Sequence, residues 1–77
     1  MSIKVLFFGS LREQVSQAQV TVGYVEPLTA AQLWQQVTGK EVMPNRIRVA
    51  VNQSYSEANS VLRDGDEVAF FPPVTGG

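Results

Sequence analysis

The chain has 77 residues and contains neither cysteine nor histidine. Without cysteine it can form no disulfide and offers no thiolate nucleophile, so we expect it to fold in a reducing cytoplasm. Without histidine it lacks the most common general base, and the usual zinc ligands are missing as well. Catalysis by this chain alone would have to rely on carboxylates, lysine or tyrosine. The sequence therefore argues against a self-contained enzyme.

An excess of one charge and a long apolar run are also missing. Six basic and seven acidic side chains give a net charge of −1, whereas a nucleic-acid binder normally shows a basic stripe. No apolar run approaches the roughly 18 residues that span a bilayer, and no basic and apolar leader opens the chain. We therefore expect a cytoplasmic protein that binds neither nucleic acid nor a membrane.

The chain does contain enough apolar side chains for the core of one small domain, because 44% of its residues are hydrophobic. Four segments alternate between apolar and other residues, as half-buried β-strands do. These predicted strands cover residues 3–8, 19–25, 47–51 and 67–71. The connections are predicted as a short helical turn over residues 11–15, a loop over 40–46, a turn with a short irregular segment over 52–60, and an Asp-Gly turn over 63–66.

The one clear helix begins at Thr29. Thr29 and Gln32 have the spacing of a capping box, in which each side chain accepts a hydrogen bond from the other residue's backbone N–H. One apolar face follows at helical spacing, formed by Ala30, Leu33, Trp34 and Val37. Gly39 suits the left-handed position after the last turn. We interpret Trp34 as a core anchor rather than as a ligand or partner contact.

The order of these elements is strand, strand, helix, strand, strand. Each strand has one apolar face, and a single long helix is available to cover it. This pattern predicts an α+β domain over residues 1–71, in which a mixed sheet wraps around one main helix.

A second apolar surface follows if the first and last strands lie side by side in the middle of the sheet. Leu6 and Phe8 would then neighbour Ala69 and Phe71 on the face away from the helix. An exposed patch of this kind is typical of a protein interface. In the alternative, loop residues such as Leu11 or Val15 fold over the patch.

The last six residues, 72–77, are predicted to form a separate flexible tail. Pro72 and Pro73 cannot continue a sheet and favour an extended arm, which at about 3.1 Å per residue reaches roughly 19 Å from the domain. Gly76 and Gly77 have no Cβ, so they fit a narrow channel and leave the terminal carboxylate open. The alternative is a frayed chain end with no role.

Several of these segments resemble the small subunit of molybdopterin synthase. The resemblance rests on residues 3–9, on Arg12 and Glu13, on residues 50–53 and on residues 64–77. It is weakest over residues 14–46, where the helix fits by position and not by motif. Membership of this family implies the ubiquitin-like β-grasp fold.

The resemblance also implies a function as a sulfur carrier. In this family the carboxylate of the last glycine, here Gly77, is adenylated with ATP by an activating enzyme that resembles ubiquitin-activating enzymes. A sulfur donor protein then supplies the sulfur of a C-terminal thiocarboxylate. The tail enters the large subunit of the synthase, where the sulfur is used to build the molybdopterin dithiolene from cyclic pyranopterin monophosphate. The carrier itself binds no cofactor, and the catalytic side chains belong to the large subunit.

The residue roles implied by this resemblance divide into two groups. Gly77 is the reacting group, Gly76 is the steric gate, and the remaining tail contacts are Pro72, Pro73, Val74 and Thr75. The predicted partner interface consists of Leu6, Phe8, Phe71 and Arg12.

Two charged features have ordinary alternatives. Arg12 is either paired with an acidic group of a partner or is a solvated surface arginine. Asp64 and Asp66 are spaced loosely like a metal loop, but two carboxylates around Gly65 are more typical of a turn. We therefore predict no metal site.

Other functions remain open from the sequence. The same diglycine chemistry would serve a sulfur carrier for thiazole or for a tungsten cofactor, although residues 70–75 favour the pterin pathway. A protein modifier that is conjugated to lysines through Gly77 needs the same activation. The last alternative is an interaction domain whose tail is inert.

Overall fold

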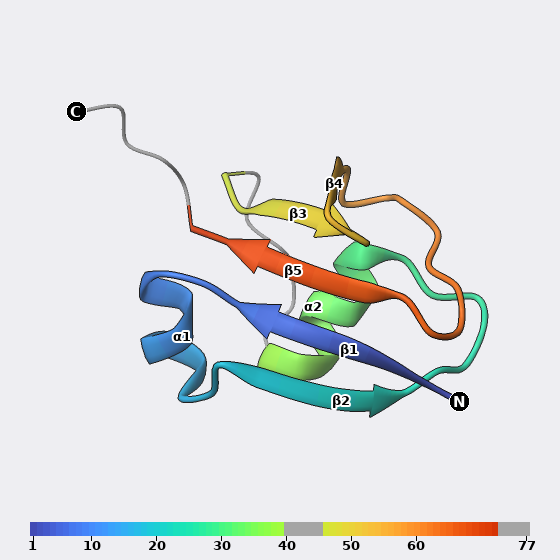
Figure 1. The fold of residues 1–77 in the computed structure, drawn as a ribbon, viewed down its shortest axis with the longest axis horizontal. Helices are drawn as coiled ribbons and strands as arrows, with labels where there is room; N and C mark the ends of the chain where they lie inside the picture. The colour runs from blue at the N-terminus through green and yellow to red at the C-terminus, as the bar shows by residue number, and fades with distance from the viewer. Residues whose placement is uncertain (40–45, 73–77) are drawn as a thin grey trace.

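The structure is a computed structural model that describes residues 1–39 and 46–72. The described elements form one five-stranded sheet and two helices (Figure 1). In chain order they are β1 (Ser2–Phe7), α1 (Ser10–Val15), β2 (Gln19–Gly23), α2 (Ala30–Thr38), β3 (Arg48–Val51), β4 (Ser54–Ser56) and β5 (Glu67–Phe71). The predicted ends of these elements lie within two residues of the observed bounds, and those of β5 are identical.

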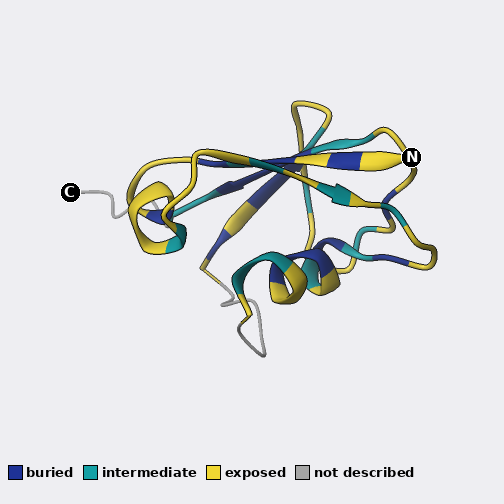
Figure 2. Cartoon of the chain, turned by 90° about the horizontal axis from the view of Figure 1, so that it is seen from below, coloured by how far each residue is buried: buried dark blue, intermediate teal, exposed yellow. Residues whose placement is uncertain are grey.

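The sheet is mixed, with the strand order β2-β1-β5-β3-β4. β1 and β5 run parallel in the middle, β2 pairs antiparallel with β1, and β3 pairs antiparallel with both β5 and β4. The predicted neighbourhood of the first and last strands is therefore confirmed. α2 lies across one face of the sheet, and neither of the described helices covers the opposite face (Figure 2).

The core lies between the sheet and α2. On the sheet side it is formed by every second residue of the strands. Ile3, Val5 and Phe7 of β1 are at most 1% exposed, and Val68 and Phe70 of β5 are fully buried. From the helix come the buried side chains of Ala30, Leu33 and Trp34. The ring of Trp34 stands edge-on to Phe70, with 5.2 Å between the centroids. The core role predicted for Trp34 is confirmed.

Local rules account for the ends of α2. Thr29 Oγ1 accepts a hydrogen bond of 3.2 Å from the Gln32 N–H, and Gln32 Oε1 accepts one of 2.8 Å from the Thr29 N–H. Gly39 ends the helix in the left-handed conformation, at φ 72°. The predicted Asp-Gly turn is also present, with Gly65 at φ 86°. These three predictions are confirmed.

The prediction for residues 52–60 was incomplete, because this segment contains strand β4. Asn52 and Gln53 form a tight turn with positive φ angles of 52° and 71°, which reverses the chain so that β4 pairs with β3. β4 has only three residues, and two of them are serines. It therefore lacks the apolar alternation from which a strand is predicted. Residues 40–45 of the predicted loop and residues 73–77 of the predicted tail lie outside the described part of the chain.

Candidate functional site

The face of the sheet that points away from α2 carries a shallow apolar depression. Leu6 of β1 lies opposite Ala69 of β5, and Ala69 lies opposite Ala50 of β3, so the three side chains form one row across the sheet. The depression has a volume of about 380 Å³. It is lined by Leu6, Phe8, Ala50, Gln53, Tyr55, Glu67, Ala69 and Phe71.

Aromatic rings form one wall of this depression. Phe8 stacks on Phe71 with the ring centroids 4.8 Å apart and the planes 7° from parallel. Tyr55 stands on the other side of Phe71, at 6.1 Å and a tilt of 54°. Phe8 is 37% exposed and Tyr55 is 78% exposed. Three neighbouring aromatic side chains that remain partly in water are typical of a surface that docks a partner.

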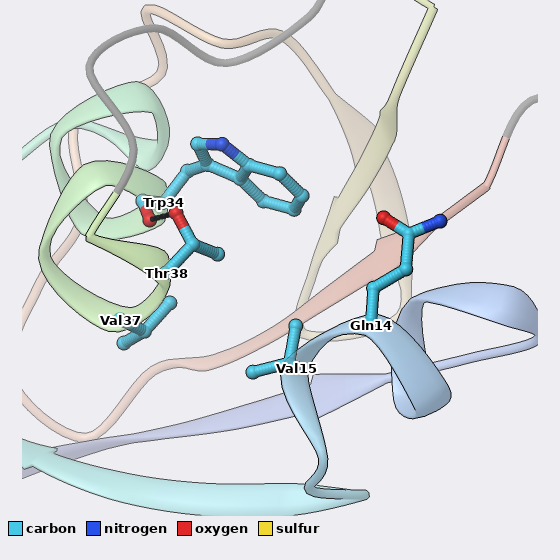
Figure 3. Close-up of a pocket in the computed structure, with 5 residues that line it drawn as sticks. All are labelled: Gln14, Val15, Trp34, Val37 and Thr38. Atoms are coloured by element: carbon cyan, nitrogen blue, oxygen red, sulfur yellow. Dashed lines mark hydrogen bonds between the residues drawn. The ribbon is translucent and has the colours of Figure 1, made fainter.

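The segment of residues 11–15 does not cover this face. Leu11 is 2% exposed and belongs to the core cluster, and Val15 packs against the same cluster. In Figure 3, Val15 lies on the side of α1 that faces Trp34 and Val37 of α2. The alternative in which Leu11 or Val15 folds over the patch is therefore wrong.

The start of the tail lies beside the aromatic wall. β5 ends at Phe71, and Pro72 is half-buried directly after it. A Cβ placed on Gly9, which has φ 58°, would lie 2.8 Å from Cγ of Pro72. The proline ring therefore approaches the backbone of the β1–α1 corner closely. The other predicted tail residues, Pro73, Val74, Thr75, Gly76 and Gly77, lie outside the described residues, and their roles stay predictions.

Two exposed arginines concern the predicted partner interface. Arg12 is exposed on α1, which lies near the end of β5 (Figure 1). Arg48 is exposed on β3 and is the register partner of Phe71. Arg12 was predicted as an interface residue, whereas Arg48 was not. The position of Arg48 beside Phe71 follows only from the pairing of β3 with β5.

Sequence reasoning also missed part of the lining of the depression. Ala50 points away from the helix, yet it is only 6% exposed. The larger side chains that line the depression partly cover it. Tyr55 and Gln53 were missed together with β4 and its turn. Glu67 was predicted as a strand residue. Because the next residue, Val68, faces the core, alternation along the strand already indicated that Glu67 faces outward.

A smaller pocket of about 130 Å³ lies between α1 and α2 (Figure 3). It is lined by Gln14, Val15, Trp34, Val37 and Thr38. The Thr38 hydroxyl donates a hydrogen bond of 2.6 Å to the carbonyl oxygen of Trp34. Among residues 1–39 and 46–72, no carboxylate, lysine or arginine lines this pocket. The described part of its lining therefore offers no acid–base group or nucleophile other than the Thr38 hydroxyl.

Asp64 and Asp66 lie in the turn around Gly65, as predicted, and the side chain of Asp66 is hydrogen-bonded there. Asp66 Oδ2 accepts a hydrogen bond of 2.8 Å from the Arg63 N–H, and Asp66 Oδ1 accepts one of 2.9 Å from Asn52 Nδ2. Within residues 1–39 and 46–72, no three acidic side chains gather as metal ligands would. Over the same residues, neither helix has the length and apolar character required to cross a lipid bilayer.

The arrangement as a whole defines a class of protein. A mixed sheet with two central parallel strands and one helix across one face is the ubiquitin-like β-grasp, so the predicted fold class is confirmed. The small archaeal modifier protein 1 of H. volcanii has the same fold, with a TM-score of 0.80 at 22% identity over 95% of this chain and 98% of that chain. The chain belongs to the ThiS family, which matches residues 5–77.

Relatives within this family agree with the resemblance seen in the sequence. The molybdopterin synthase sulfur carrier subunit of Escherichia coli (strain K12) is 41% identical over 97% of this chain and 99% of its own length. A chain in the complex of subunits 1 and 2 of the molybdopterin-converting factor from Helicobacter pylori superposes with a TM-score of 0.65. It is 25% identical, and both chains are covered completely. The predicted family is confirmed.

Proposed function

We propose that this chain is the sulfur carrier subunit of a molybdopterin synthase and that its open face docks on the large subunit. The observation that carries the proposal is the position of the Phe8–Phe71 stack on the open face of the sheet. Phe71 directly precedes Pro72, so the stack lies where the tail begins. The Escherichia coli relative bears this name, and the Helicobacter pylori relative is found in a complex of two subunits. Both support the proposal.

The reacting group in this proposal is the terminal carboxylate of Gly77. A carboxylate is a poor electrophile because its leaving group would be oxide. Adenylation by an activating enzyme consumes ATP, releases pyrophosphate and provides AMP as a good leaving group. Sulfide-level sulfur (HS⁻) supplied by the donor protein then attacks the acyl carbon, the bond to AMP breaks, and a thiocarboxylate remains on Gly77. This sulfur is delivered to cyclic pyranopterin monophosphate in the large subunit, and two carriers are used because a dithiolene contains two sulfurs.

The carrier needs no catalytic side chain for this role. Its task is to hold one sulfur atom at the end of an arm, and at about 3.1 Å per residue an extended segment of residues 72–77 would reach roughly 19 Å. Docking of the body brings the sulfur and the pterin together, which converts a dilute reaction into a positioned one. A chain without cysteine or histidine suits this task, because acid–base groups and the nucleotide site belong to the partners.

The docking energy in this proposal comes from the aromatic wall. Burial of apolar surface contributes about 25 cal/mol per Å², and interface hot spots are enriched in large aromatic side chains and arginine. Leu6, Phe8 and Phe71 therefore form the apolar anchor. Arg12 faces an acidic group of the partner at the rim, where it contributes less than the anchor does.

A reconstituted synthase tests the function. The wild-type chain is combined with the activating enzyme, ATP, a sulfur donor and the large subunit, and molybdopterin formation from cyclic pyranopterin monophosphate is measured. We expect product with the wild-type chain and none after deletion of Gly77. The deletion variant should keep the thermal unfolding midpoint of the wild type, since no core residue is removed. Product formed by the deletion variant would contradict the proposal.

The same reconstitution separates the remaining alternatives. Covalent ladders on other proteins, in place of pterin product, would indicate a protein modifier. Sulfur transfer from Gly77 without any product from the pterin would indicate a carrier for a different acceptor, such as a thiazole precursor.

A further inference from the structure

Asn52 connects two parts of the chain through three hydrogen bonds. Its N–H donates a bond of 2.7 Å to the carbonyl oxygen of Glu67. Its side-chain Oδ1 accepts a bond of 2.9 Å from the Glu67 N–H, and its Nδ2 donates one of 2.9 Å to Asp66 Oδ1. One residue of the β3–β4 turn is thereby fixed to the beginning of β5.

The conformation of this turn explains why the residue is asparagine. Asn52 has φ 52°, in the left-handed region that most side chains avoid and that asparagine tolerates. Its short amide carries both a donor and an acceptor, so it can bond to Asp66 and Glu67 at the same time. Alanine at this position would lose both side-chain bonds, and glycine would lose them while keeping the backbone conformation.

The turn determines where β4 lies. β4 is at the edge of the sheet and pairs only with β3, through three register pairs. Tyr55 is its central residue and lies opposite Ala50. Because Tyr55 is 78% exposed, its own packing holds it weakly. The position of its ring at the edge of the depression therefore depends on the anchored turn.

We propose that Asn52 is a positioning residue which holds Tyr55 at the depression, where Tyr55 and Phe71 enclose an apolar side chain of the docked large subunit. The floor of the depression is formed by Ala50 and Ala69, and its volume of about 380 Å³ has room for a leucine or phenylalanine side chain. The large subunit as occupant rests on the proposed function. The Asn52–Tyr55 relation itself rests on the hydrogen bonds and the strand register.

A double-mutant cycle tests the proposal, with the affinity of the full chain for the large subunit measured by titration calorimetry. Tyr55→Ala should weaken binding about tenfold, as truncation of an aromatic interface residue does. Asn52→Ala should weaken it about fivefold through displacement of Tyr55. In the Tyr55→Ala background, Asn52→Ala should have almost no further effect. If the affinity loss of the double variant equals the product of the two single losses, the proposal is overturned, because Asn52 would then act independently of Tyr55.

Two further variants separate this role from general destabilisation. Thr29→Ala removes the cap of α2 on the other side of the sheet and should lower stability by an amount similar to Asn52→Ala, with unchanged affinity. Asn52→Gly suits the positive φ and should fold, yet it should bind as weakly as Asn52→Ala. Asn52→Gly that binds like the wild type would contradict a role for the side chain. Circular dichroism confirms that each variant is folded at the temperature of the titration.

The outcomes also separate this proposal from the proposed function. If the wild-type chain does not bind the large subunit, both are overturned. If the wild type binds and delivers sulfur, and both Asn52 variants bind as tightly as the wild type, only the role of Asn52 is overturned.

Discussion

The two faces of the sheet come from the same strands and have opposite properties. On the helix side, Phe7 and Phe70 stack at 5.9 Å and are at most 1% exposed. On the open side, Phe8 and Phe71 stack at 4.8 Å, yet Phe8 is 37% exposed. Each open-face phenylalanine directly follows a core phenylalanine in the sequence. A chain of this size has only one core, so its second apolar face is available for a partner.

This difference explains how an exposed apolar face is tolerated. Ala50 and Ala69 place small side chains at its centre, while the larger rings lean on one another at one end. Stacking removes part of their surface from water before any partner binds. The face therefore keeps a depression into which a partner side chain fits.

The largest effect should come from the core face. Phe70→Ala should lower the free energy of unfolding by about 3–5 kcal/mol, because it leaves a cavity beside Trp34 and Phe7. Phe71→Ala, one residue further along, should lower it by less than about 1.5 kcal/mol. Urea unfolding of both variants measures the difference. Equal losses would remove the distinction between the two faces.

The converse effect concerns binding. Phe71→Asp should weaken binding to the large subunit by about 2–4 kcal/mol, because docking would bury an unpaired charge. Its unfolding free energy should stay close to that of Phe71→Ala. Titration against the large subunit measures the affinity. An unchanged affinity would exclude Phe71 from the interface.

A smaller effect is expected where neither face is involved. Thr29→Ala should lower the free energy of unfolding by about 1 kcal/mol through loss of the capping box. The affinity for the large subunit should stay the same, as thermal unfolding and titration together would show. A loss of affinity in Thr29→Ala would mean that partner binding depends on the overall stability of the domain and not on the open face alone.

The smallest effect is expected at the rim. Arg12→Ala and Arg48→Ala should each weaken docking by about 0.2–1 kcal/mol, with the loss reduced at high salt. Arg63→Ala is the matched control, because this exposed arginine belongs to the turn before β5. An equal, salt-dependent loss in all three variants would indicate a general charge effect.

Local patterns predicted most of the fold. Strand alternation assigned Ile3, Val5 and Phe7 to the core, and the capping box placed the start of α2 at Thr29. That the first and last strands lie side by side in the middle was an assumption, and β1 and β5 do so in the parallel direction. From that arrangement came the Leu6, Phe8 and Phe71 surface.

The remaining features depend on contacts that are distant in the sequence. Asn52 bonds to Asp66 and Glu67, which are 14 and 15 residues away, and no local pattern specifies these bonds. Tyr55 stands between two serines on a strand of three residues, so its place at the depression becomes visible only once β4 is paired. Arg48 required the register of β3 against β5 in the same way.

The central claim is that the acyl end of Gly77 is the group that carries sulfur. The most direct test is the intact mass of the chain after incubation with the activating enzyme, ATP and a sulfur donor. The account predicts the mass gain of a single sulfur-for-oxygen exchange, located on the C-terminal peptide and absent when Gly77 is deleted. An unchanged mass, or a gain that survives the deletion, would contradict it.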